Sequence, residues 1–90
     1  MTCVILLSSI HRVMKAEKLL KGRGLNVDII PVPREISSDC GVAIELPMEI
    51  GEEALRLIGE HRMAITECYT RDDTGKFEKK TSWVSCVHPD

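Results

Sequence analysis

Aromatic residues are scarce in this chain, whose 90 residues include only Tyr69, Phe77 and Trp83. Proteins that bind nucleic acids combine a broad basic surface with, for single strands, aromatic side chains on which the bases stack. Here the net charge is −2, with six Lys or Arg against two acids in residues 1–34 and six against twelve in residues 35–90. We therefore predict no nucleic-acid partner. Two solvated helix faces of opposite charge explain the asymmetry most simply, and a docking surface for a charged protein is the alternative.

Long apolar runs are also missing. Residues 3–7 form the longest apolar run near the start, and a membrane-spanning helix needs about 20 such residues. No basic segment precedes this run as in a secretory signal. The sequence thus predicts no membrane association and a cytoplasmic location, where thiols stay reduced.

No Cys-x-x-Cys pair occurs among the four cysteines, which are Cys3, Cys40, Cys68 and Cys86. Neither a disulfide framework nor a zinc site is therefore indicated, and Cys86 with His88 would supply only two metal ligands. A glycine-rich phosphate loop is absent as well. We predict no metal site and no cofactor, and we expect Cys3 and Cys68 to lie in the core because both fall within predicted strands.

Apolar periodicity predicts four strands and two helices in residues 1–70. The strands cover residues 3–7, 25–30, 42–46 and 64–70. The first helix runs from the capping residues Ser8 and Ser9 to Lys21. Its predicted apolar stripe contains Ile10, Val13, Met14, Ala16 and Leu20.

The second helix is predicted to open at Pro47, with acidic residues in its first turn. The resulting order, β-α-β-β-α-β, predicts an α+β fold of the ferredoxin-like type, in which a four-stranded antiparallel sheet carries both helices on one face. Strands 1 and 3 would then be central. The other face would be exposed, with Ala43 and Tyr69 on it, and a homodimer could form through it.

The chain divides into residues 1–70, the predicted domain, and residues 71–90, a C-terminal extension. Asp72 and Gly75 belong to a turn signal, after which residues 76–84 form either a short edge strand or part of a flexible tail. Because this segment offers little to bury, we expect its deletion from Lys76 onward to leave stability almost unchanged.

The segment from 31 to 41, Pro-Val-Pro-Arg-Glu-Ile-Ser-Ser-Asp-Cys-Gly, separates the second and third predicted strands. A hairpin needs only about two to five residues there, and longer loops are usually functional or disordered. Two prolines stiffen this loop, and Cys40 lies at its end beside Gly41. We interpret Cys40 as the reactive group, with the alternative that it is a small buried residue at a strand start.

This loop resembles that of the putative selenium/sulfur carrier protein-like family, over roughly residues 2–70. The matching pattern is Pro-x-Pro-Arg-x-Ile-Ser-Ser-x-Cys-Gly, and residues 15–21 of the first helix are a weaker match. The resemblance implies that Cys40 carries sulfur or selenium, received from a donor such as a cysteine desulfurase and relayed to an acceptor protein. The tail beyond residue 70 lies outside the pattern.

A carrier thiol must react as a thiolate, which is a minor form of an ordinary thiol at neutral pH. Arg34 could stabilise that thiolate, Ser37 and Ser38 could donate hydrogen bonds to it, and Gly41 leaves room beside the sulfur, whereas Asp39 opposes a second negative charge. The plain alternative gives Arg34 a surface ion pair and makes the serines turn residues.

A non-enzymatic carrier is favoured over a catalyst, although the sequence leaves the question open. Acyl transfer by Cys40 would need a histidine base, and no histidine lies in the loop; His11 and His61 fall on polar helix faces. The alternative function is a non-covalent small-molecule or protein-binding module that uses residues 31–41 and the exposed sheet.

Overall fold

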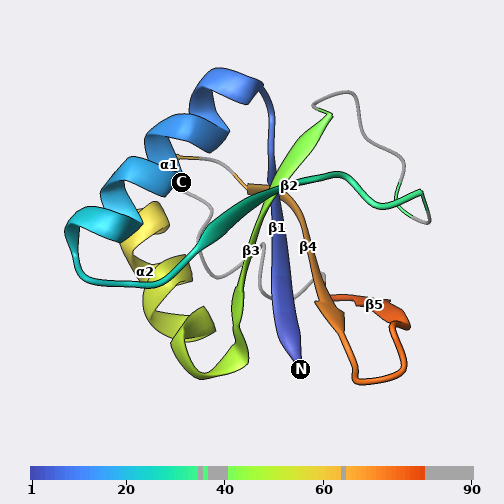
Figure 1. The fold of residues 1–90 in the computed structure, drawn as a ribbon. Coiled ribbons are helices and arrows are strands. Elements are labelled where there is room, and N and C mark those ends of the chain that lie inside the picture. Colours follow the sequence, from blue (N-terminus) through green and yellow to red (C-terminus); the bar gives the residue numbers. More distant parts are fainter. Residues whose placement is uncertain (35, 37–40, 64, 81–90) are drawn as a thin grey trace.

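A computed structural model describes residues 1–34, 36, 41–63 and 65–80. The elements, drawn in Figure 1, are β1 (Thr2–Leu7), α1 (Ile10–Gly22), β2 (Asp28–Pro31), β3 (Val42–Pro47), the 3-10 helix η1 (Met48–Ile50), α2 (Gly51–Glu60), β4 (Ile65–Arg71) and β5 (Phe77–Lys79). The fold is therefore α+β, as predicted. Among the strands, the predicted bounds differ most at β2, which begins at Asp28 and not at residue 25.

The described strands form one antiparallel sheet in the order β2-β3-β1-β4-β5. β1 pairs with β3 through Cys3 opposite Leu46, and with β4 through Ile5 opposite Cys68. The expectation that the first and third strands are interior is confirmed. The predicted number of four strands is wrong, because β5 adds a fifth beside β4, and the ferredoxin-like assignment stays a prediction.

The return of the chain into β5 depends on Asp72. One oxygen of its carboxylate accepts hydrogen bonds from the backbone N–H of Thr74 at 2.9 Å, from the Thr74 hydroxyl at 2.6 Å and from the backbone N–H of Lys76 at 3.0 Å. These bonds hold the pKa of the Asp72 carboxyl below its ordinary value, and the bond from the Thr74 hydroxyl has the largest effect. Gly75 completes the turn at φ +88°, a conformation that glycine adopts without strain.

α1 and α2 lie on the same face of the sheet (Figure 1). The N-cap of α1 is Ser9, whose hydroxyl accepts a hydrogen bond from the Arg12 N–H at 3.3 Å. Val13, Ala16 and Leu20 are buried, as predicted. Two members of the predicted stripe are misplaced, because Ile10 and Met14 are 48% and 55% exposed.

α2 begins later than predicted, because residues Met48–Ile50 form η1 before it. Gly51 lies so close to the sheet that a Cβ on it would be 2.9 Å from the Cys3 sulfur. The close approach lets α2 bury Ala54, Leu57 and Ile58 against the helix-covered face, where they join β1, β3 and β4 side chains in the main core.

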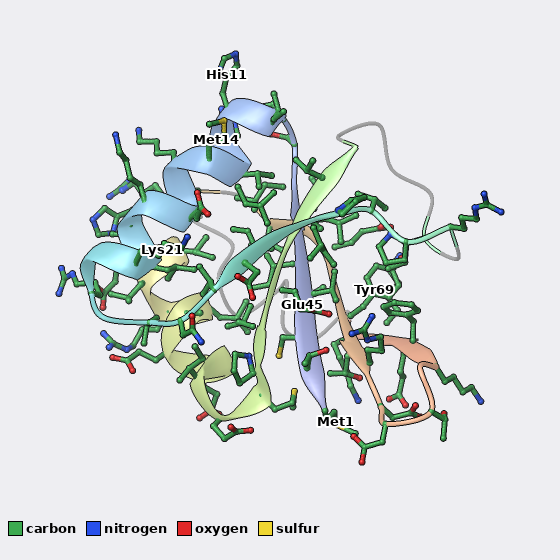
Figure 2. The ribbon with its side chains drawn as sticks, viewed as in Figure 1. Met1, His11, Met14, Lys21, Glu45 and Tyr69 are labelled. Carbon is green, nitrogen blue, oxygen red and sulfur yellow. The ribbon has the colours of Figure 1, made fainter. Side chains whose placement is uncertain are left out.

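The opposite face of the sheet is covered, which corrects the prediction that it is exposed. Val4, Leu6 and Ala43 are at most 1% exposed and form a second cluster with Ile36. Partly buried side chains of β2, β4 and β5 and of the segment after β2 pack against this cluster: Ile30, Val32, Tyr69 and Phe77. Tyr69 lies on the side of the sheet away from α1 (Figure 2). A homodimer through an open sheet face is thereby not supported.

Candidate functional site

The loop between β2 and β3 is closed at its base. Pro31 and Val42 are the last ladder pair, and beyond them the Val32 N–H donates to the Gly41 carbonyl at 3.1 Å. Gly41 has φ +81° and open space where a Cβ would stand. A side chain there would strain the backbone without a clash, so glycine is favoured by conformation rather than by crowding.

Ile36 anchors the middle of this loop. Its N–H donates to the Pro33 carbonyl at 3.0 Å, which forms a turn, and its side chain is only 5% exposed. It packs in the second cluster with Leu6 and Ala43. Burying an isoleucine side chain contributes about 1.5–3 kcal/mol. The loop is therefore attached to the sheet at its base and at its centre.

The structure places two of the five predicted site residues. Arg34, in the turn that leads to Ile36, and Gly41, at the start of β3, are both exposed. Cys40, Ser37 and Ser38 lie outside the described residues. Contact between Arg34 and Cys40 stays a prediction, and so does the alternative of a surface ion pair, because Glu35 beside Arg34 lies outside the described residues as well.

Two other thiols are buried in the main core, as predicted. Cys3 is 1% exposed and Cys68 is fully buried. The Cys3 thiol donates to the Met48 sulfur at 3.2 Å. Burial raises the pKa of Cys3 to about 11; burial, and then the nearby Cys3 thiol, raise that of Cys68 to about 12. Both thiols are protonated and inaccessible at neutral pH, so neither is a nucleophile there.

Among the described residues, neither His11 nor His61 forms a hydrogen bond with the loop between β2 and β3. His11 is exposed on the first turn of α1 and points away from the molecule (Figure 2). His61 is exposed at the end of α2, where its Nδ1 lies 3.1 Å from the Leu57 carbonyl. The prediction that both lie at the surface is confirmed. Cys86 and His88 lie outside the described residues.

The described ranges contain no group of three His, Cys, Asp or Glu side chains that could hold a metal ion. No helix of the described part is long and apolar enough to cross a membrane. A shallow hollow of about 380 Å³ lies between Met1, Thr2 and the β4–β5 turn. Because Thr2 pairs with Pro47 at the far end of β3 from Val42, this hollow is separate from the loop.

Ile36 is the positioning residue that the sequence argument did not single out. The signal in the sequence is that Ile36 is the one apolar residue between Arg34 and Asp39. A lone apolar side chain within a long loop often marks where the loop packs onto the domain.

One family model, described as "Putative Se/S carrier protein-like", matches residues 2–70. That range includes β1 to β3, all of β4 except Arg71, both α-helices and the whole loop between β2 and β3. Neither a curated protein nor a solved structure matches the chain. Since the matched residues make up most of the chain, it belongs to the Se/S carrier protein-like family.

Proposed function

We propose that this protein carries sulfur or selenium on Cys40, accepting it from one protein and passing it to another. The observation that carries the proposal is the distribution of thiols within the family match. Residues 2–70 contain three cysteines, and two of them, Cys3 and Cys68, are buried with raised pKa values. A carrier that uses a cysteine of the matched region is thus left with Cys40.

The transfer step is a thiol–persulfide exchange. The Cys40 thiolate attacks the terminal sulfur of a persulfide on the donor; the new S–S bond forms as the donor's S–S bond breaks, and the donor cysteine leaves as a thiolate. No external oxidant or reductant is consumed. A donor that holds selenium in the terminal position would transfer it by the same displacement. An acceptor thiolate then attacks the terminal sulfur or selenium held on Cys40, and Cys40 leaves as a thiolate, which completes the relay.

Loop residues would prepare Cys40 for this step. The Arg34 guanidinium would stabilise the thiolate, and the Ser37 and Ser38 hydroxyls would donate hydrogen bonds to it. Gly41 would leave space for the incoming persulfide. The exposure of Arg34 and Gly41 supports this arrangement, because a donor enzyme must reach this part of the loop.

The proposed partners are a sulfur donor such as a cysteine desulfurase and an acceptor protein. Relay between persulfides needs reduced thiols, so the proposal places the protein in the cytoplasm. The carrier function belongs to residues 1–70, and residues 71–90 are an extension whose β5 completes the sheet. The attachment of the loop through Ile36 would limit its motion and so reduce the entropy lost on docking.

The test is to incubate the reduced protein with a cysteine desulfurase and cysteine and to locate added mass by peptide mapping. We expect one added sulfur, confined to Cys40, and its loss in Cys40→Ser. Cys86→Ser is the matched control and should load normally. Equal labelling of the other cysteines, or none, would refute the carrier. If Cys40 is not loaded and Cys40→Ser still binds a partner, the alternative of a non-covalent binding module is favoured. That module would bind through the loop alone, because the sheet face is covered.

A further inference from the structure

The outer surface of the helix layer is divided by charge. On α1, the exposed cations are Arg12, Lys15, Lys18 and Lys21. On α2, the exposed acids are Glu52, Glu53 and Glu60, with Arg56 among them. α1 and α2 contact each other and run in opposite directions on the same face of the sheet (Figure 1). A basic strip therefore lies beside an acidic strip.

Among the described residues, no ion pair joins α1 to α2. The ion pairs described for the two helices are all internal to one helix: Lys21 with Glu17 at 3.0 Å, and Arg56 with Glu60 at 2.8 Å and with Glu53 at 3.8 Å. The remaining cations of α1 have no ion pair among the described residues. Arg12, Lys15 and Lys18 thus keep their charge available for another molecule, and α2 keeps a net negative charge although Glu53 and Glu60 share Arg56.

The first turns of α1 deviate from ordinary helix chemistry. The macrodipole favours acids at a helix N-terminus, yet the first turn of α1 has none and Arg12 lies in it. Ile10 and Met14, one turn apart, are about half exposed, and Figure 2 shows Met14 on the outside of α1. Exposed apolar side chains among unpaired cations are typical of a contact surface.

We propose that the helix layer is the contact surface for a second copy of this chain, with α1 of each protomer on α2 of its partner. Such a contact is isologous: a two-fold axis parallel to the helices places the basic strip of each copy on the acidic strip of the other. The second copy is the occupant because one surface carries both members of the complementary pair. Neither face of the sheet offers a comparable pair of charged strips, because apolar side chains pack against both faces.

The helix directions add to the match. In this arrangement α1 is antiparallel to the partner's α2, so the C-terminal half of α1, with Lys18 and Lys21, faces the N-terminal turn of the partner's helix. That turn carries Glu52 and Glu53. Complementary charges therefore meet at the N-terminal turn of each α2, and the macrodipoles oppose each other favourably.

The patch is small, which sets the expected strength. Two side-by-side helices of 13 and 10 residues cover a surface of roughly 20 by 20 Å. This area lies at or below the low end of specific interfaces, which bury about 600 Å² or less from each partner when they are weak. The dimer should therefore be weak, and sensitive to salt because its contacts are mostly charged.

The first experiment is sedimentation equilibrium of the full chain at about 0.01 M and about 1 M salt, where the Debye length is about 30 Å and about 3 Å. We expect self-association at low salt that weakens at least about tenfold at high salt. A protein that stays monomeric at low salt up to about 1 mM, or a dimer indifferent to salt, would overturn the proposal.

The second experiment identifies the surface by charge reversal. Lys15→Glu/Lys18→Glu cancels the net positive charge of the α1 strip, and Glu52→Lys/Glu53→Lys makes the α2 strip basic. Each variant alone should associate about a hundredfold more weakly, since every reversed charge acts twice in a symmetric dimer. Mixed in equal amounts, they should form a heterodimer, because the substituted side chains of the two variants then carry opposite charges.

The control is Lys76→Glu/Lys80→Glu, at the two residues that flank β5, which Figure 1 places away from the helix layer. It changes the net charge as much as the α1 reversal, yet it should dimerise like the wild type and gain nothing on mixing with the α2 reversal. If the α1 reversal still dimerises alone, or if the mixture of the two reversed variants stays monomeric, the helix layer is not the interface.

Discussion

At the scale of single residues, the structure describes how Ile36 holds the loop between β2 and β3 to the sheet, whereas Cys40 lies outside the described residues. Arg34 and Gly41 could be singled out from the sequence by their types, because a cation in the loop and a glycine next to Cys40 suit a reactive thiol. Ile36 could not be ranked in that way. Its role depends on Val4, Leu6 and Ala43 lying beneath the loop, and that juxtaposition requires the strand order.

Ile36 therefore supplies the first prediction. Ile36→Ala should lower the free energy of unfolding by about 2–4 kcal/mol, because it removes buried methyl groups and leaves a cavity beneath the loop. Urea unfolding followed by circular dichroism measures the loss. Ile10→Ala, at an exposed isoleucine, is the matched control and should change stability by less than about 0.5 kcal/mol. Equal effects of the two substitutions would show that the loop does not rest on the sheet.

The buried thiols of Cys3 and Cys68 predict a pH dependence. Their pKa values rise from 9.0 to about 11 and about 12. An unfolded chain loses these protons near pH 9 while the folded chain keeps them, so the stabilising contribution is complete below pH 9 and is lost as pH rises toward the folded pKa values. Each thiol then costs about 1.4 kcal/mol per pH unit between its two pKa values.

The measurement is urea unfolding of the reduced protein between pH 8 and about 11. Cys3→Ala/Cys68→Ala should lose stability less steeply over this range than the wild type. Cys86→Ala serves as the control for a general effect of alkaline pH. If the double variant and the wild type give parallel pH profiles, the two thiols are not protonated in the folded state as described.

At the scale of elements, α1 shows where sequence periodicity is ambiguous. Ile10, Val13 and Met14 satisfy the same i, i+3, i+4 spacing as a buried stripe, but only Val13 reaches the core. Around the helix, Ile10 and Met14 lie on one side of Val13, whereas the buried Ala16 and Leu20 lie on its other side. Apolar spacing therefore identifies the approximate face of a helix, but the centre of that face is set by what the helix packs against.

β5 gives the third prediction, which reverses the expectation that the segment from Lys76 onward is dispensable. The Phe77 ring meets the Tyr69 ring edge-on at 6.5 Å between centroids, and the Arg71 guanidinium lies 5.9 Å from the Phe77 centroid. Phe77→Ala should destabilise the protein by about 1–3 kcal/mol, less than a fully buried phenylalanine. Thermal unfolding measures the change, with Lys76→Ala as the neighbouring exposed control.

An unchanged midpoint for Phe77→Ala would restore the original expectation for the tail. The sequence could not rank Phe77 because a three-residue strand has no measurable periodicity. The turn before β5 was predictable from Asp72 and Gly75. The pairing of β5, however, requires that one edge of β4 stay free when β1 pairs with the other edge. A short edge strand is specified by its partner as much as by its own residues.

At the scale of the whole molecule, the α+β class followed from the periodicity, whereas the covering of the second face did not. The sequence shows that Ala43 and Tyr69 share a face, but it does not show what lies over them. Ile36 and Phe77, more than 40 residues apart in sequence, both contribute to that cover. Such long-range packing is fixed by the sheet order, and no local pattern encodes it.

The last prediction concerns cooperativity, because the two clusters share β1. Its side chains alternate, with Cys3, Ile5 and Leu7 in the main core and Val4 and Leu6 in the second cluster. Losing either cluster would remove the packing on one face of β1, so we expect one two-state transition.

The measurement is methyl NMR in increasing urea. Leu6 and Ile36 of the second cluster should give the same midpoint as Leu20 and Ile58 of the main core. In Ile36→Ala, both sets of methyl signals should shift to the same lower midpoint. An earlier transition confined to Leu6 and its neighbours would instead make the second cluster a separate, weaker unit, and the loop could then detach from the sheet while the main core stays folded.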